Sequence, residues 1–153
     1  MRVAAVLLSV VLTALPAAAV PEEGPPPEQL FKQFGLFGEW AGDCAAPAAP
    51  ENPHVNISEI APGVILEEHD LGPDNVLNRY SVLAARRLSA TELSVEVLFH
   101  PGAENEERQM LTFQVRDNTR RTMFNQVKGG PVQVKDGIVL WNGSKTPVLH
   151  KCE

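Results

Sequence analysis

The sequence predicts an all-β protein, a small antiparallel up-and-down β-barrel of about 8–9 strands that follows one short N-terminal helix. Three observations lead to this fold class. After Gly38, apolar and polar residues alternate with a period of two. Pairs of turn-forming residues separate the alternating runs. The chain has 2 cysteines, Cys44 near the start of the β region and Cys152 near the end. A β-sandwich with the same bridge is the alternative.

The first residues have the features of a secretory signal peptide. Arg2 is followed by a mainly apolar run from Val3 to Leu15 and then by the small residues 17–19. We expect residues 1–19 to be removed on export, which makes the protein periplasmic or secreted. No second long apolar run follows, so we expect no membrane span after cleavage.

The remainder divides into a tether and one domain. Residues 20–27 are rich in proline, which predicts an extended tether, and residues 28–153 predict a single β-barrel domain. Leu30, Phe31 and Phe34 share one face at helical spacing and Gly35 ends the pattern, so we expect a short helix over 28–34 that lies over an apolar opening of the domain.

The strands follow in order. Leu93, Val95, Val97 and Phe99 give the clearest alternation, typical of a sheet with one buried face. Asp136-Gly137 indicates a two-residue hairpin. The expected segments lie near 38–44, 54–60, 64–70, 76–86, 91–99, 108–116, 119–127, 132–135, 138–141 and 147–152.

The two cysteines suggest how the sheet ends. In an oxidising compartment Cys44 and Cys152 are expected to pair. A disulfide requires Cα atoms within about 7 Å, so the last strand lies beside the first and the meander closes into a barrel. A bridge across so long a loop is worth about 4–5 kcal/mol.

Gly38, Glu39 and Trp40 form a Gly-x-Trp sequence directly after the expected helix. This resembles the start of the lipocalins and related calycin barrels, in which a tryptophan on the first strand plugs the closed end; an ordinary core position is the alternative for Trp40. The chain is also similar in style to small periplasmic β-barrel proteins of bacteria whose roles are undefined. Secreted bacterial inhibitors of metalloproteases share a small barrel of this kind. The resemblance implies a fold more than a function.

Composition and motifs argue against most chemistry. The net charge of −6 disfavours nucleic acid and anionic lipid as partners. No histidine pair has metal-ligand spacing, and no nucleophile elbow or phosphate loop is present. We therefore expect no enzyme, no catalytic residues, no cofactor and no metal. Glu67, Glu68 and His69 are interpreted as a solvated strand end, and the pairs 86–87 and 120–121 as mainly surface arginines, with at most one of each pair inward.

One strand carries the candidate ligand site. If Arg79 faces solvent, strand parity turns Val76, Asn78, Tyr80 and Val82 inward, which predicts Asn78 and Tyr80 as polar ligand-binding residues in an apolar interior. We expect a small apolar ligand in the interior of the barrel or at its mouth. The alternative is a protein-interaction module, such as an inhibitor of a secreted enzyme or an envelope-assembly factor, acting through surface loops, particularly 45–53.

Overall fold

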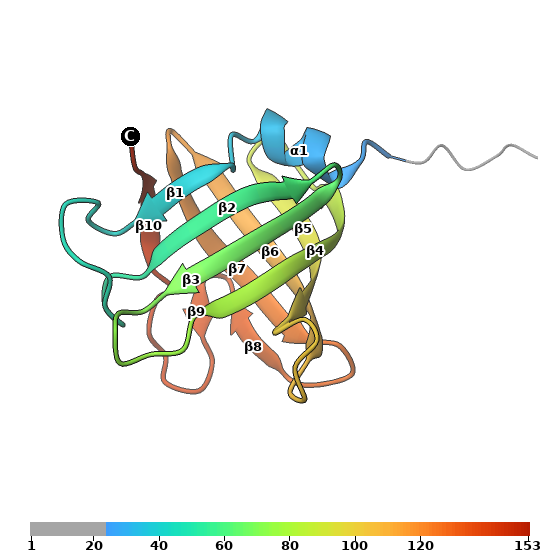
Figure 1. Cartoon of the computed structure of the whole chain (residues 1–153). Helices are drawn as coiled ribbons and strands as arrows, with labels where there is room; N and C mark the ends of the chain where they lie inside the picture. The colour runs from blue at the N-terminus through green and yellow to red at the C-terminus, as the bar shows by residue number, and fades with distance from the viewer. Residues whose placement is uncertain (1–23) are drawn as a thin grey trace, which may run out of the picture.

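The computed structural model describes residues 24–153 and shows an antiparallel sheet whose strands β1–β7 and β10 close into an eight-stranded barrel (Figure 1). β10 closes it by pairing with both β1 and β7. The elements are α1 (Pro27–Gln33), β1 (Gly38–Ala41), β2 (His54–Ala61), β3 (Val64–Asp70), β4 (Asn78–Arg87), β5 (Glu92–Phe99), β6 (Glu107–Arg116), β7 (Thr119–Val127), β8 (Val132–Lys135), β9 (Ile138–Val139) and β10 (Val148–Lys151). The predicted barrel is confirmed in preference to the sandwich.

The expected signal peptide, residues 1–19, lies outside the described residues, as do residues 20–23 of the tether. Within residues 24–153, no helix has both the length and the apolar character needed to cross a membrane.

Helix α1 lies across one end of the barrel (Figure 1). Proline in the first turn suits a helix start, because the backbone N–H that proline lacks would have no partner within the helix at that position. Gly35, with a φ of +64°, ends the helix. Leu30 and Phe31 are fully buried and belong to the barrel core, as the apolar face predicts. Phe34 is partly buried, with the guanidinium of Arg87 4.5 Å from its ring centroid.

Trp40 lies in the core close to this covered end. Its exposed fraction is 1 %, and its indole N–H donates to the carbonyl of Leu36, 2.8 Å away. The ammonium of Lys151 is 5.3 Å from the indole ring and donates to the carbonyl of Gly35 at 2.6 Å. These contacts tie β1 and β10 to the end of the helix. Leu36, in the segment between α1 and β1, also belongs to the core. The rest of the buried core comes from alternate residues of the strands: Val55, Ile57, Ile65, Leu93, Val95, Val97, Leu111, Phe113 and Leu149.

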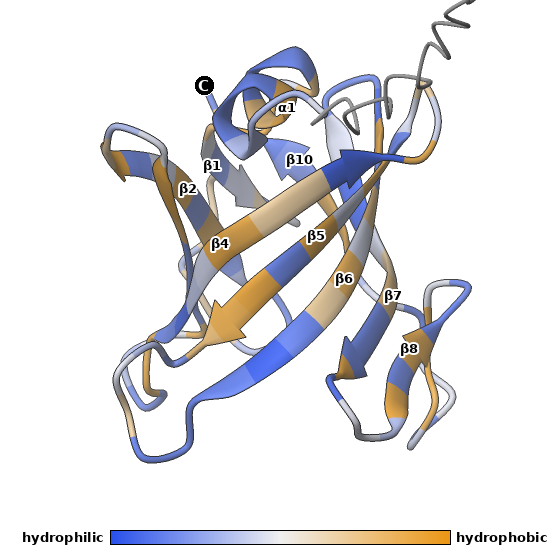
Figure 2. Cartoon of the chain, turned by 90° about the vertical axis from the view of Figure 1, so that its right-hand side faces the viewer, coloured by the Kyte–Doolittle hydropathy of each residue, from blue (hydrophilic) through white to orange (hydrophobic). Residues whose placement is uncertain are grey.

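The β8–β9 hairpin departs from the continuous meander expected from the sequence. Its turn is the predicted Asp136-Gly137 pair, and both residues have positive φ (52° and 71°), as the tightest two-residue hairpins require. The hairpin stands outside the closed barrel, beyond β7 (Figure 2). β7 is long enough to pair with β10 through residues 119–121 and with β8 through residues 124–126. The barrel therefore closes without the hairpin.

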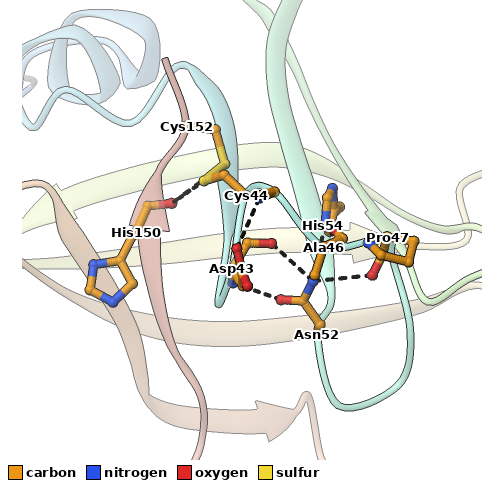
Figure 3. Close-up of a disulfide and its surroundings, with 9 residues drawn as sticks. Asp43, Cys44, Ala46, Pro47, Asn52, His54, His150 and Cys152 are labelled. Atoms are coloured by element: carbon orange, nitrogen blue, oxygen red, sulfur yellow. Dashed lines mark hydrogen bonds between the residues drawn. A yellow bond between two sulfur atoms is a disulfide. The ribbon is translucent and has the colours of Figure 1, made fainter.

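The disulfide joins Cys44 to Cys152 with a Cα–Cα distance of 5.6 Å, as predicted (Figure 3). It lies beside the short ladder in which β1 pairs with β10. The loop after β1 is held by Asn52, whose side chain accepts from the backbone N–H of Asp43 and donates to the carbonyls of Asp43 and Pro47. The loop of residues 42–53 is thereby held next to the disulfide.

Candidate functional site

A cavity of about 210 Å³ lies inside the barrel, toward the end away from α1. Its position follows from its walls, because it includes residues from the start of β2, the end of β3 and the start of β4, whereas α1 contacts the opposite end of those strands. The wall is apolar at Val55, Leu111, Phe113, Val134 and Leu149 and polar or charged at Glu67, His69, Tyr80, Arg120, Arg121, Thr122, Asn125 and Thr146, with Pro53 and Pro147 completing it.

A buried ion pair crosses the interior. The Nη2 of Arg120 donates to the Oε1 of Glu67 at 2.7 Å, and both side chains are at most 5 % exposed. The Nε2 of His69 lies 2.6 Å from the same oxygen. Burial alone raises the pKa of Glu67, but the charge of Arg120 and the hydrogen bonds from His69 and Arg120 outweigh it and lower the pKa to about 2. The carboxyl group is therefore ionised at neutral pH, and Nε2 of His69 carries the hydrogen that it donates.

Arg120 retains hydrogen-bonding capacity inside the cavity. Its guanidinium carbon is 4.3 Å from the ring centroid of Phe113, so the planar group lies over an aromatic face. Its Nη1 is buried and has no hydrogen-bond partner among the described residues. A buried guanidinium N–H without a partner is costly, which makes this atom a candidate ligand contact.

A second buried atom without a partner belongs to Asn125, at the end of a chain of amides. The Nε2 of Gln109 donates to the Oε1 of Glu107 at 2.5 Å, and the Nδ2 of Asn125 donates to the Oε1 of Gln109 at 3.2 Å. An ionised carboxylate only accepts, so Gln109 must turn its NH₂ toward Glu107 and its oxygen toward Asn125. The Oδ1 of Asn125 is then left buried, with no partner among the described residues.

Tyr80 lies on the cavity wall, on the side predicted from strand parity. Its ring centroid is 4.8 Å from that of His69 on β3 and 4.8 Å from that of Phe99 on β5. Burial, and then the negative charges of Glu67 and Glu107, raise the pKa of the Tyr80 hydroxyl well above its usual value. The hydroxyl therefore remains protonated and able to donate to a ligand.

Asn78, the other residue predicted to bind a ligand, does not line this cavity. It is half-buried, and its Oδ1 lies 3.1 Å from the Nε2 of His100, which places it in a side-chain cluster at the rim of β4 and β5. The prediction that Val76 faces inward is wrong: Val76 precedes β4 and is 79 % exposed. Parity holds only within the strand, and β4 begins at Asn78.

One side of the cavity is formed by the segment that returns from the hairpin to β10. The Oγ1 of Thr146 donates to the carbonyl of Thr122 at 2.7 Å and accepts from the Nε of Arg121 at 3.0 Å. The Nη2 of Arg121 also donates to the carbonyl of Gly137 at 2.6 Å. A Cβ at Gly137 would lie 2.6 Å from that nitrogen, so only glycine allows this approach. The return segment is thus fastened to β7 beside the cavity.

No family model, no curated protein and no solved structure matches this chain. The assignment of a function therefore depends on the geometry of the site. Across residues 24–153, no three His, Cys, Asp or Glu side chains are grouped so as to hold a metal ion.

Sequence reasoning missed the centre of the site. Glu67 was expected at a solvated strand end and Arg120 mainly at the surface, and both expectations are wrong because the side chains are buried against each other. A signal was present for one of them: Ile65, Glu67 and His69 share a face of β3, and Ile65 is an evident core residue. For Arg120 no local signal exists, since its partner lies 53 positions away in the sequence.

Proposed function

We propose that this protein binds a small ligand with a mainly apolar body in the cavity of its barrel, after export to the periplasm or the cell exterior. The observation that carries the proposal is that the barrel is hollow at one end while α1 and the apolar core fill the other. A barrel of eight strands is about the size at which an interior can either be filled by side chains or hold one small ligand.

The residues of the cavity wall suit a ligand with an apolar body that makes polar contacts at a few fixed points. Val55, Leu111, Val134 and Leu149 offer aliphatic surface, and Phe113 adds an aromatic ring. Ligand sites characteristically combine such a wall with a few oriented polar groups. The volume of about 210 Å³ exceeds the ~150 Å³ that is enough for benzene in an engineered cavity, so a compact molecule fits.

The proposal is one of binding without catalysis. The carboxylate of Glu67 is committed to Arg120 and has a pKa of about 2, which makes it a weak general base at neutral pH. The raised pKa of Tyr80 keeps its hydroxyl neutral, so it is a poor base as well. The site favours holding a molecule over activating one.

Native mass spectrometry of the protein purified from its own source tests the proposal. We expect a mass in excess of the disulfide-bonded chain that disappears on denaturation. The variant Val134→Phe places a larger side chain in the cavity, so we expect this variant to lack the added mass. Val64→Phe, at an exposed position on β3 away from the cavity, is the matched control and is expected to keep it. Absence of any added mass, or its retention in Val134→Phe, contradicts the proposal.

A protein-interaction role is the second candidate, and one observation favours it. On the β8–β9 hairpin side, Trp141 is 83 % exposed and the adjacent Leu140 is 52 % exposed. Exposed aromatic residues of this kind are enriched at protein interfaces. The same experiment separates the two candidates: an added mass the size of a protein chain, lost in Trp141→Ser and retained in Val134→Phe, favours the second one.

A further inference from the structure

We propose that the ligand is an uncharged molecule that accepts a hydrogen bond from the Nη1 of Arg120 at one point and donates a hydrogen bond to the Oδ1 of Asn125 at another. Both side chains line the same cavity, and both atoms are buried without a partner in the described part of the chain. This inference deepens the proposed function and rests on it.

The requirement at Arg120 is for an acceptor. A guanidinium group has only donors, and the Nη2 of Arg120 is already directed at Glu67. The side chain is 2 % exposed and held over the ring of Phe113, so the guanidinium has little freedom to reach another partner or the solvent. A carbonyl or ether oxygen on the ligand satisfies it.

The requirement at Asn125 is for a donor. The orientation of its amide is set by Gln109 and, behind it, by the carboxylate of Glu107, which fixes the direction of both amides. Rotating Asn125 to present its NH₂ to the cavity places two oxygens, its own and that of Gln109, against each other. A hydroxyl or N–H group on the ligand satisfies the unpartnered Oδ1 instead.

The charges of the site favour a neutral molecule. The positive charge of Arg120 is balanced by Glu67 at 2.7 Å. The second arginine on the wall, Arg121, forms no ion pair with the described residues, but its Nε and Nη2 are occupied by hydrogen bonds to Thr146 and Gly137 and are not free for a ligand anion. A carboxylate in the cavity faces the carboxylate of Glu67 and the bare oxygen of Asn125. Burying that charge without a dedicated cation is more costly than burying a neutral polar group.

The volume limits the size of the molecule. Because ~150 Å³ accommodates benzene, a cavity of about 210 Å³ accommodates on the order of ten non-hydrogen atoms. A single ring with one carbonyl and one hydroxyl group is therefore a suitable probe of the site.

The test is a titration of the oxidised protein at about pH 6, followed by NMR, with five neutral probes and one anion. The neutral probes are ethylbenzene, which has neither group, 4-ethylphenol with a donor only, acetophenone with an acceptor only, and 3- and 4-hydroxyacetophenone with both groups at two spacings. The anion is 4-hydroxybenzoate, which matches 4-hydroxyacetophenone in size. We expect one of the two hydroxyacetophenones to bind about five- to tenfold more tightly than acetophenone and than 4-ethylphenol, and 4-hydroxybenzoate to bind more weakly than either.

Two variants assign the effect to the proposed atom. Asn125→Ala is expected to remove the advantage of the hydroxyl group and to keep that of the carbonyl. Asn56→Ala, at an exposed position on β2, is the matched control and is expected to change neither. The wild-type series stands by itself if Asn125→Ala does not fold.

The outcomes separate this inference from the proposed function. If ethylbenzene binds in the cavity but the added polar groups do not tighten binding, or if 4-hydroxybenzoate binds best, the cavity is a binding site and the ligand class is wrong. If no probe, ethylbenzene included, shifts the resonances of cavity residues, the proposed function is contradicted as well.

Discussion

The buried pair of Glu67 and Arg120 makes stability depend on pH in a way that the variant Glu67→Gln reveals. The folded-state pKa of Glu67 is about 2, against a usual value of 4.5. Because the folded pKa is the lower one, the ionised carboxylate contributes stability above pH 4.5, and that contribution is lost as the pH falls toward 2. At about 1.4 kcal/mol for each pH unit, the contribution is about 3 kcal/mol.

Glu67→Gln removes the titrating group and leaves Arg120 buried without a counter-ion. Breaking a buried pair by removing one partner costs about 3–5 kcal/mol, so we expect the variant to be less stable than the wild type by that amount at pH 7. Since the wild type loses about 3 kcal/mol of the contribution from Glu67 by pH 2, the difference between the two proteins is expected to shrink by about 3 kcal/mol.

Urea unfolding of the oxidised wild type and of Glu67→Gln, followed by tryptophan fluorescence at several values between pH 7 and pH 2, measures this difference. Titration of the other carboxyl groups affects both proteins and cancels. A control variant, Glu96→Gln, alters a carboxylate whose arginine partner is half-exposed, and we expect a difference from wild type below about 1 kcal/mol. A difference between wild type and Glu67→Gln that stays constant from pH 7 to pH 2 refutes the reasoning.

Three further predictions concern other parts of the molecule. Replacement of Cys44 and Cys152 by serine is expected to lower the melting temperature by about 10–20 °C, because closing so long a loop is worth about 4–5 kcal/mol; calorimetry checks this, and an unchanged melting temperature argues against it. Tyr80→Phe is expected to weaken a retained ligand by about 1 kcal/mol and to change stability little, since Tyr80 lines the cavity; a loss of stability with unchanged binding would make the hydroxyl structural. N-terminal sequencing of exported protein is expected to begin at Val20, and a sequence beginning at Met1 removes the export argument.

Much of the fold could be predicted because its determinants are local. The strand that holds Leu93, Val95 and Val97 alternates cleanly, and it forms β5 with those residues buried. The turn at Asp136-Gly137 formed where its residue types require it. The pairing of Cys44 and Cys152 followed from their number and the export signal.

The exclusion of the β8–β9 hairpin from the barrel could not be predicted from alternation. Val132 and Val134 alternate with polar residues like any barrel strand. What decides their place is that β7 pairs with β10 along its first residues and with β8 along its last, a choice between partners far apart in the sequence. The alternation of apolar and polar residues specifies which face of a strand is buried, but it does not specify which strand lies beside it.

The candidate site was predicted only in part, for a similar reason. Parity placed Tyr80 on the cavity wall, where the structure has it. Asn78 has the same parity but lies at the first residue of β4, where the barrel rim offers His100 as a partner. A charged residue is rarely buried unless the fold brings a partner to it. Glu67 and Arg120 are such partners, so the burial of either one cannot be predicted from the sequence around it.

A crystal structure of the protein purified from its own source tests binding inside the barrel most directly. We predict continuous density for a compact molecule in the cavity, with one atom within hydrogen-bonding distance of the Nη1 of Arg120 and another near the Oδ1 of Asn125. Separate ordered waters bonded to both of these atoms, or side chains that close the cavity, would contradict it.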